Sequence, residues 1–310
     1  MKNYINTNSI EDILALANEG LHLKNTGIST KPGDGKVLTC LYLNPSLRTR
    51  LSTEIAARKL GMDCINLAAE SAWKLETRTG VVMDGDAAEH IREQAEVLSR
   101  YSDIIAIRAF PGLENAEEDY HDDFISRFAR YCHKPIVNLE SGSLHPLQGL
   151  ADLITIQETR RVERPKIVLT WAPHPRKLPQ SVANSFSRTI QQAGYDLTIA
   201  CPPGLELSEE YTGNARVVHH QEEAFEGADY IYAKNWSSFR DYGQTIDRPD
   251  WTVTQKKMGH TNNGQFMHCL PVRRNVVVSD EVLDSESSLV GLQAENRIFA
   301  AQVVLKHLLG

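Results

Sequence analysis

The stretch KVLTCLYLNPSLRTRLSTEIAARKLG, residues 36–61, contains the pattern that decides the fold. Residues 36–43 form a short apolar run, which predicts a buried β-strand. Residues 46–61 then predict a helix, because Ser46 can cap its N-terminus and Gly61 can end it. A strand that leads directly into a helix is the building unit of α/β proteins.

The same alternation continues along the chain and predicts parallel sheets with crossover helices. A chain of 310 residues suits two such units, each with its own core. The turn-forming segment Ser-Gly-Ser-Leu-His-Pro, residues 141–146, marks the boundary that we expect between them. The other expected strands are residues 103–110, 135–140, 166–172, 196–201, 228–234 and 265–270, and the other expected helices are residues 86–100, 148–162, 178–194 and 294–309.

The composition argues against several classes of protein. A formal net charge of -7 argues against nucleic-acid binding, which usually needs a basic surface. No stretch approaches the ~20 apolar residues that a membrane-spanning helix requires, and the N-terminal residues lack the apolar run of a signal peptide. The five cysteines are scattered and lack C-x-x-C spacing, which predicts reduced thiols in the cytoplasm and no metal site.

The first chemical motif is Ser46-Leu-Arg-Thr-Arg50, at the start of the predicted helix that follows the first strand. Unpaired backbone N–H groups and the helix dipole attract an anion to such a position. Arg48 and Arg50 add charged donors suited to phosphate oxygens. The alternative interpretation is a capped surface helix with solvated arginines.

Three further polar clusters lie at the ends of predicted strands, where α/β proteins usually bind ligands. Arg108 lies near the end of the strand expected at residues 103–110, and His145-Pro-Leu-Gln148 opens the second unit. His268-Cys-Leu-Pro271 ends a strand and is followed by Arg273 and Arg274. A single histidine more often has a structural role, but clusters that recur at strand ends favour a shared site.

Taken together, these motifs resemble the aspartate and ornithine transcarbamylases over the whole chain. The S-x-R-T-R, H-P-x-Q and H-C-L-P motifs occur in the order and spacing of that family. Other segments resemble the subgroup that acts on N-acylated ornithines, nearest to the N-succinylornithine transcarbamylases. These segments are Trp73-Lys-Leu-Glu76, Met83-Asp-Gly-Asp86, Trp171-Ala-Pro-His-Pro-Arg176, Ala233-Lys-Asn-Trp236 and Thr261-Asn-Asn263.

The resemblance implies two doubly wound parallel-sheet domains with the active site in the cleft between them. Residues 1–141 would bind carbamoyl phosphate and be joined by the C-terminal helix of residues 293–310, and residues 142–292 would bind the acylated ornithine. It also implies a homotrimer in which Trp73 reaches a neighbouring active site. No cofactor and no metal are needed, because the leaving phosphate can accept the proton of the amine and the protein positions both substrates.

The resemblance assigns the carbamoyl phosphate site residue by residue. The attacked carbonyl oxygen gains negative charge, which preorganised donors from Thr49, Arg108 and His145 would stabilise. Cys269 joins this catalytic set through its main chain, since a thiol that merely lines the pocket is favoured over a covalent nucleophile. The implied carbamoyl phosphate ligands are Ser46, Leu47, Arg48, Thr49, Trp73, Arg108, His145, Gln148, Leu270 and Arg297.

The second substrate is where the chain departs from the plain ornithine enzymes. Their D-x-x-x-S-M-G element is absent, and Lys234 stands where an aspartate is expected. A base in place of an acid suits a substrate whose α-nitrogen is an uncharged amide and whose charges are carboxylates. Arg176 and Lys234 are therefore candidate carboxylate partners, although Lys234 has the alternative of a solvated strand end. Glu140 resembles the residue that faces the substrate nitrogen, and Cys269 also belongs to the implied acylornithine site.

Two positions bear on the acyl group. The succinyl enzymes have proline and the acetyl enzymes glutamate where this chain has Ala88, and a glutamate would repel a succinyl carboxylate. The lysine that acetyl-specific enzymes carry just after Arg274 and Asn275 is also absent. Both features favour N-succinyl-L-ornithine as the substrate, and arginine biosynthesis as the pathway. N-acetylornithine and free ornithine are the alternative substrates.

Two other classes of function share part of this sequence pattern. A dinucleotide-dependent dehydrogenase shares the α/β pattern, but no G-x-G-x-x-G follows a predicted strand, and Gly33-Asp-Gly35 precedes one. A non-catalytic relative would keep the fold but lose part of the site, whereas every expected residue is present.

Overall fold

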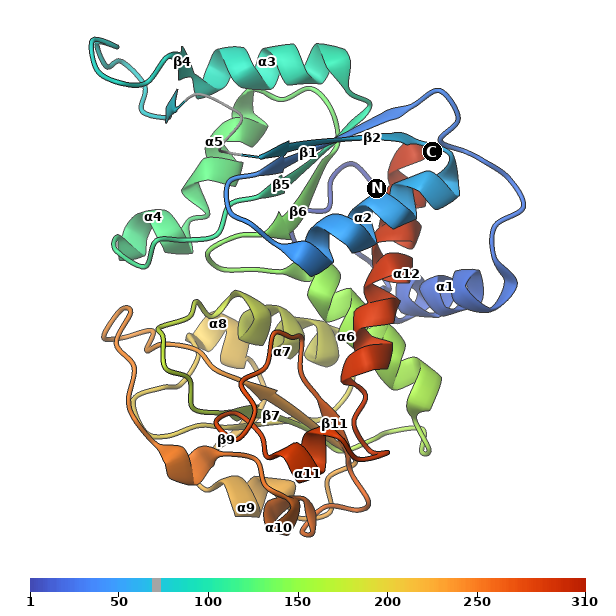
Figure 1. Ribbon diagram of the computed structural model, residues 1–310, viewed down its shortest axis with the longest axis vertical. Coiled ribbons are helices and arrows are strands. Elements are labelled where there is room, and N and C mark those ends of the chain that lie inside the picture. Colours follow the sequence, from blue (N-terminus) through green and yellow to red (C-terminus); the bar gives the residue numbers. More distant parts are fainter. Residues whose placement is uncertain (69–73) are drawn as a thin grey trace.

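The computed structural model describes residues 1–68 and 74–310 and contains two parallel sheets, one above the other in Figure 1. The predicted architecture of two doubly wound parallel sheets is confirmed. The first sheet has the order β2-β1-β5-β6, from β1 (Val37–Tyr42), β2 (Asp63–Ala68), β5 (Ile104–Arg108) and β6 (Ile136–Glu140). The second has the order β11-β10-β7-β8-β9, from β7 (Ile167–Trp171), β8 (Leu197–Ala200), β9 (Arg216–Val218), β10 (Tyr230–Lys234) and β11 (Gln265–Met267).

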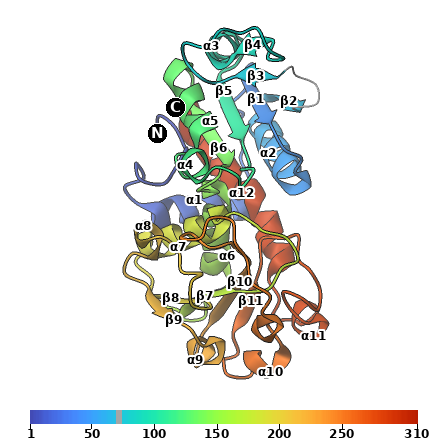
Figure 2. The ribbon, with the colours of Figure 1, turned by 90° about the vertical axis from the view of Figure 1, so that its left-hand side faces the viewer.

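Helices cover both faces of the first sheet, with α2 on one side and α5 on the other (Figure 2). A small third sheet pairs β3 (Leu75–Glu76) with β4 (Glu89–His90). No helix in the described part of the chain is both long enough and apolar enough to cross a bilayer. The helices are α1 (Ile13–Thr26), α2 (Leu47–Leu60), α3 (Ile91–Tyr101), α4 (Ala116–Tyr120), α5 (Asp123–Tyr131), α6 (Pro146–Thr159), α7 (Ser181–Gln192), α8 (Glu209–Thr212), α9 (Gln221–Phe225), α10 (Gln255–Met258), α11 (Asp280–Leu283) and α12 (Val290–Leu309), with a 3-10 turn at Pro249–Trp251.

The strand orders place one switch point in each sheet. In the first sheet the chain runs from β1 to β2 and then returns to add β5 on the other side of β1. In the second it runs from β7 through β8 and β9 and returns to add β10 on the other side of β7. Ligands bind outside the carboxyl ends of strands at such points. The loops that leave β1, β5, β7 and β10 therefore form the expected place for a site.

Two helices, α6 and α12, join the two sheets. α12 packs against α1, α2 and α6, and α6 also packs against α7 of the second sheet. The largest apolar core accordingly contains residues of both halves. Gly149 allows the close approach of α6 and α7, because a Cβ atom there would lie 2.6 Å from the Thr189 hydroxyl. The domain boundary expected between residues 141 and 142 remains a prediction. α6, which follows it, contacts elements of both halves and so belongs to neither half alone.

Some elements differ from the sequence-based expectation. The helix expected at residues 86–100 begins at Ile91, because Glu89–His90 pairs with β3 as a short strand. The strand expected at residues 265–270 ends at Met267. β2 was not predicted, since it is an edge strand that buries none of its residues fully. α1, α5 and the three-residue strand β9 were also missed.

Candidate active site

A cavity of about 710 Å³ lies between the two sheets, at the carboxyl ends of their strands. Its walls come from the N-terminus of α2, the ends of β5, β6 and β10, the loop after β7, the loop after β11, and α6, α7 and α12. Among the described residues, Glu140 is the one carboxylate in its lining, although the whole chain has a net charge of -7. Anionic ligands therefore suit this cavity. The cationic lining residues are Arg48, Arg108, Arg176, Lys234, Arg273 and Arg297.

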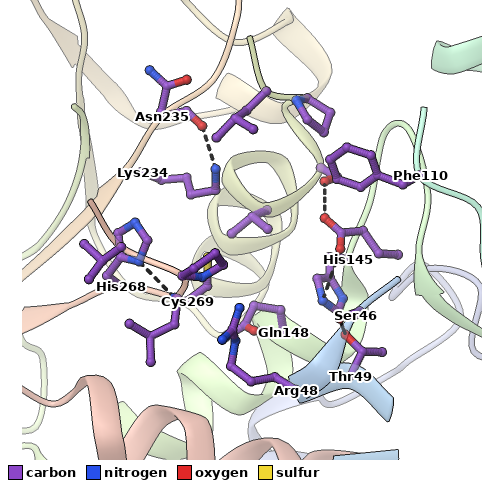
Figure 3. Close-up of a pocket in the computed structure, with 18 of the residues that line it drawn as sticks. Ser46, Arg48, Thr49, Phe110, His145, Gln148, Lys234, Asn235, His268 and Cys269 are labelled. Carbon is purple, nitrogen blue, oxygen red and sulfur yellow. Dashed lines mark hydrogen bonds and ion pairs between the residues drawn. The ribbon is translucent and has the colours of Figure 1, made fainter. Parts of the chain in front are cut away.

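One end of the cavity is the first turn of α2, which carries Ser46, Arg48 and Thr49 (Figure 3). The Ser46 hydroxyl donates to the Thr49 hydroxyl over 2.9 Å and does not cap the helix. The backbone N–H groups of this first turn thus keep their positive potential, and no acidic residue is present to neutralise it. Leu47 and Arg48 also line the cavity, whereas Arg50 lies outside its lining. This end is built to hold an anion.

A buried cluster of charged and polar groups forms the middle of the cavity. Arg108, with 8% of its surface exposed, donates to Glu140 Oε2, and Ser181 Oγ donates to Glu140 Oε1 over 3.1 Å. His145 Nε2 lies 3.8 Å from Glu140 Oε2, and the backbone N–H of His145 donates to Ser185 Oγ on α7. Two buried nitrogens of the cluster, Arg108 Nε and His145 Nδ1, have no hydrogen-bond partner within the described residues.

The pKa values of this cluster follow from burial and charge. Burial, reinforced by the neighbouring cations Arg297 and Arg108, lowers the pKa of His145 to about 3 even though Glu140 opposes the change. Burial would raise the pKa of Glu140, but the Arg108 guanidinium and the hydrogen bond from Ser181 hold it below its ordinary value. A neutral imidazole and an ionised carboxylate therefore face each other at neutral pH.

Arg297 of α12 joins this cluster to the anion-binding end. Its Nη2 donates to Thr49 Oγ1 over 2.7 Å, and its Nη1 donates to Gln148 Oε1. These two partners lie 248 and 149 residues away in the chain. The charged guanidinium of Arg297 thus donates to a neutral acceptor on α2 and to another on α6, which fixes the position of one helix relative to the other.

The loop after β11 forms another wall of the cavity. His268 Nδ1 accepts a hydrogen bond from the backbone N–H of Leu270 over 2.9 Å, which helps to hold Leu270 at a φ of 56°. A positive φ is unusual for leucine, so the contact supports an otherwise strained backbone. Burial raises the pKa of the Cys269 thiol, which makes a thiolate nucleophile at neutral pH unfavourable.

The opposite end of the cavity is cationic and lies at the ends of β7 and β10 (Figure 3). Lys234 is buried and donates to the backbone oxygen of Asn235 over 2.7 Å, and burial lowers its pKa. Arg176 and Arg273 are exposed and reach the cavity from two different loops. This end can therefore receive carboxylate groups by charge and by hydrogen bonding.

All but two of the residues predicted for the site line this cavity. Trp73 lies outside the described residues. Ala88 is exposed between β3 and β4, where its backbone N–H donates to Lys74 O, and it does not line the cavity of its own chain. Sequence reasoning missed Phe110, His174, Ser181 and Asn235. Of these, His174 and Asn235 lie inside motifs that were recognised, whereas Ser181 and Phe110 carried no signal.

Acid is expected to destabilise the protein through its two buried histidines. Burial lowers the pKa of His268 and of His145 to about 3, below the ordinary value of 6.5. Between these values the unfolded chain binds protons that the folded chain excludes, so the contribution of these two histidines to stability is complete above pH 6.5 and is lost as the pH falls towards 3.

This effect is measurable in one variant. His268→Asn keeps an acceptor for Leu270 but cannot take up a proton. We expect the slope of unfolding free energy against pH near pH 5 to fall by about 1.4 kcal/mol per pH unit, the value for one proton. Urea unfolding between pH 5 and 7 measures the slope, and equal slopes for variant and wild type would contradict the prediction.

Comparison with known proteins places this geometry in a family. The family model described as "Aspartate/ornithine carbamoyltransferase, carbamoyl-P binding domain" matches residues 3–158. The model of the Asp/Orn binding domain of the same family matches residues 178–308. The chain belongs to the aspartate/ornithine carbamoyltransferase family. The resemblance inferred from the motifs is thereby confirmed. The first matched region contains the whole first sheet, and the second contains every strand of the second sheet except β7.

Two curated carbamoyltransferases illustrate the relationship. The N-succinylornithine carbamoyltransferase of Bacteroides fragilis (strain 638R) is 47% identical over 100% of this chain and 99% of its own length. The N-acetylornithine carbamoyltransferase of Xanthomonas campestris pv. campestris is 36% identical over 100% of this chain and 98% of its own length. The similarity to the succinyl enzyme is thus clearly higher.

Solved structures of N-acetyl-L-ornithine transcarbamylase have the same fold. One variant, in which a glutamate is replaced by proline, is complexed with carbamyl phosphate and N-succinyl-L-norvaline. It has a TM-score of 0.93 and 36% identity, over 99% of this chain and 100% of that chain. A variant with alanine in place of the same glutamate was solved with the same two ligands. The family's transcarbamylase fold is therefore present in this chain.

Proposed function

We propose that this carbamoyltransferase family member transfers the carbamoyl group of carbamoyl phosphate to the side-chain amine of N-succinyl-L-ornithine. The products are N-succinyl-L-citrulline and phosphate. The observation that carries the proposal is the cavity itself, which joins a helix N-terminus suited to phosphate to a cationic end suited to carboxylates. The 47% identity to an N-succinylornithine carbamoyltransferase supports the choice of substrate.

Carbamoyl phosphate is assigned to the α2 end and the middle of the cavity. Its phosphate would accept hydrogen bonds from the first turn of α2 and from Ser46, Arg48 and Thr49, with Leu47 contributing main chain. Its carbonyl oxygen would lie among Thr49, Arg108 and His145. The carbamoyl NH2 group would donate to the Gln148 side-chain oxygen and to the backbone carbonyls of Cys269 and Leu270, with Arg297 beside Gln148.

The reaction proceeds by attack of the neutral ornithine amine on the carbonyl carbon. Negative charge builds on the carbonyl oxygen, where the Arg108 guanidinium and the neutral His145 donate hydrogen bonds. The C–N bond forms, the bond between carbon and the phosphate oxygen breaks, and phosphate leaves with the proton of the amine. Glu140 orients Arg108 through their ion pair and faces the incoming amine.

The acylated ornithine is assigned to the opposite end. Its α-nitrogen is an amide, so it needs no carboxylate partner, and its two carboxylates need cations. Lys234, Arg176 and Arg273 line this end, while the Glu140 carboxylate is already paired with Arg108. A free ornithine would bring an unmatched ammonium group into this cationic region, which is unfavourable.

A product assay tests the proposal directly. Carbamoyl phosphate is supplied with N-succinylornithine, N-acetylornithine or ornithine in parallel, and the citrulline products are separated by mass. We expect N-succinylcitrulline to form with the highest kcat/KM and free citrulline to be absent. Carbamoylation of ornithine alone would refute the proposed substrate, and the absence of every product would refute the activity.

Arg176 is expected to recognise the second carboxylate of the succinyl group. Arg176→Ala should lower kcat/KM for N-succinylornithine by about 10–100-fold, the range for a charged hydrogen bond, and change the value for N-acetylornithine much less. Steady-state kinetics with both amines measure the difference. An equal loss with both would mean that Arg176 does not distinguish the acyl groups.

We also propose that the enzyme is a trimer that acts in the cytoplasm within arginine biosynthesis. Leu47, Leu51 and Ile55 follow one face of α2 and are 69%, 49% and 38% exposed, and Ile65 on β2 is also exposed. A second copy that covers this apolar face would bring its own Trp73 and Ala88 segment towards the cavity. Five free cysteines suit a reducing compartment. A fully active monomer in sedimentation experiments would contradict the trimer.

A further inference from the structure

A buried carboxylate, Asp152, lies behind the wall of the cavity and has no role in the chemistry described above. It is on α6, is 0% exposed, and does not line the cavity. Its Oδ1 atom accepts a hydrogen bond from Gln148 Nε2 over 2.6 Å and a second one from Gln293 Nε2, also over 2.6 Å. The two glutamines come from α6 and α12. One oxygen therefore holds two amide groups from different helices.

Each glutamine extends from Asp152 to a different part of the site. Gln148 Oε1 accepts from Arg297, which in turn donates to Thr49 at the start of α2. Gln293 Oε1 accepts from the backbone N–H of His268 over 3.0 Å. His268 then supports the backbone of Leu270. Asp152 thus connects the anion-binding turn of one half to the loop after β11 in the other half.

The chemistry of these neighbours fixes both amide orientations. Gln148 lies between a guanidinium, which only donates, and a carboxylate oxygen, which accepts. Its NH2 group must therefore face Asp152, and its oxygen must face the cavity side. Gln293 is oriented in the same way between Asp152 and the N–H of His268. Without Asp152, each NH2 group would lose its buried acceptor, and neither side chain would be held between two partners.

The burial of Asp152 is consistent with this arrangement. Burial raises its pKa to about 7, although hydrogen bonds from Gln293 and Gln148 oppose the change. Oδ1 accepts its two hydrogen bonds in either protonation state, because a proton would be carried by Oδ2. A carboxyl group so far from water is costly unless it is hydrogen-bonded. The contacts with both glutamines offset that cost.

We propose that Asp152 is a positioning residue, which holds Gln148 and the loop after β11 so that acceptors face the carbamoyl NH2 group. This inference rests on the proposed carbamoyl transfer. Asp152 does not touch the substrate and acts through the two glutamines. Its loss should therefore weaken recognition of the carbamoyl group and leave recognition of the phosphate group largely intact.

The test compares Asp152→Leu with a matched control on the same helix. Thr155→Val, one turn further along α6, removes a buried hydrogen bond to Asn296 of α12 that leads away from the cavity. We expect Asp152→Leu to raise KM for carbamoyl phosphate on the order of 10–100-fold, the loss for a hydrogen bond to a charged group. Calorimetric affinity for inorganic phosphate should change by less than about threefold. Thr155→Val should lower the melting temperature without changing either constant.

Two further variants complete the experiment. Asp152→Asn keeps an acceptor oxygen and should restore KM to within a few-fold of wild type. If the leucine variant does not fold, Asp152→Ser, which is smaller than aspartate and cannot reach both amides, carries the same expectations. An unchanged KM in the leucine or serine variant, or an equal rise in Thr155→Val, would overturn the inference. Inactivity of the wild-type protein would instead refute the proposed function.

Discussion

Replacing Arg108 by methionine is expected to reduce kcat/KM for carbamoyl transfer by about 10³-fold, the scale seen when a preorganised donor to a developing oxyanion is removed. Arg108 ends β5 inside the cavity and is buried. Its Nε atom has no partner among the described residues and is available to a ligand. The loss should appear mainly in kcat, because the donor strengthens as charge develops in the transition state.

A second variant separates this effect from a loss of stability. Arg108→Met alone leaves Glu140 buried without its ion-pair partner, which is costly for the folded state. Adding Glu140→Gln removes that unpaired charge, so the double variant should recover much of the melting temperature but not the activity. Recovery of activity together with stability would show that Arg108 acts only on the fold.

Arg100→Met serves as the matched control. Arg100 is exposed on α3 and pairs with Glu96 one turn away, at the surface. Exposed pairs of this kind contribute roughly 0–1 kcal/mol to stability. We therefore expect wild-type kinetics for this variant under the same assay conditions.

Replacing Lys234 by methionine is expected to raise KM for N-succinylornithine by about 100-fold, the scale for loss of one partner of a buried charged contact. Lys234 lies at the end of β10, is buried, and lines the cationic end of the cavity. Methionine keeps a similar length and loses only the charge and the donors. KM for carbamoyl phosphate should remain close to the wild-type value, because that substrate is assigned to the other end.

Lys257→Met is the matched control for this substitution. Lys257 is a partly buried lysine of the same half of the protein, and burial lowers its pKa as it lowers that of Lys234. It donates to Gln221 and to the backbone oxygen of Thr252, away from the cavity. We expect a loss of stability with unchanged KM values. Equal rises in KM for both variants would remove the case for Lys234 as a substrate contact.

Local pattern predicted much of the architecture. The strands that were predicted are mainly those buried across their whole length, such as Ile104–Arg108 and Ile136–Glu140, because continuous burial requires a continuous apolar run. The edge strand Asp63–Ala68 has only exposed and half-buried residues, and the strand Arg216–Val218 is only three residues long. Neither contains enough apolar sequence to be recognised.

The candidate site likewise has parts that could be predicted from the sequence and parts that could not. The first turn of α2 was recognisable because its anion-binding property is local and depends on a helix start with serine, arginine and threonine. The ion pair of Arg108 with Glu140 was not predicted, since its partners lie on neighbouring strands 32 residues apart in the chain. The role of Asp152 could not be predicted from the sequence, because it depends on the side chains that contact this aspartate in the folded protein.

The sequence by itself determined the alternation of buried strands with crossover helices, the type of chemistry at each strand end, and the excess of cationic groups among the motifs. These properties depend on neighbours within a few residues, where propensity, capping and periodicity act. The tertiary structure decided which groups meet. Arg297 reaches Thr49, and Gln293 reaches Asp152, only because α12 packs beside both α2 and α6. Such contacts depend on the burial of apolar faces shared by the whole molecule, and no local pattern specifies them.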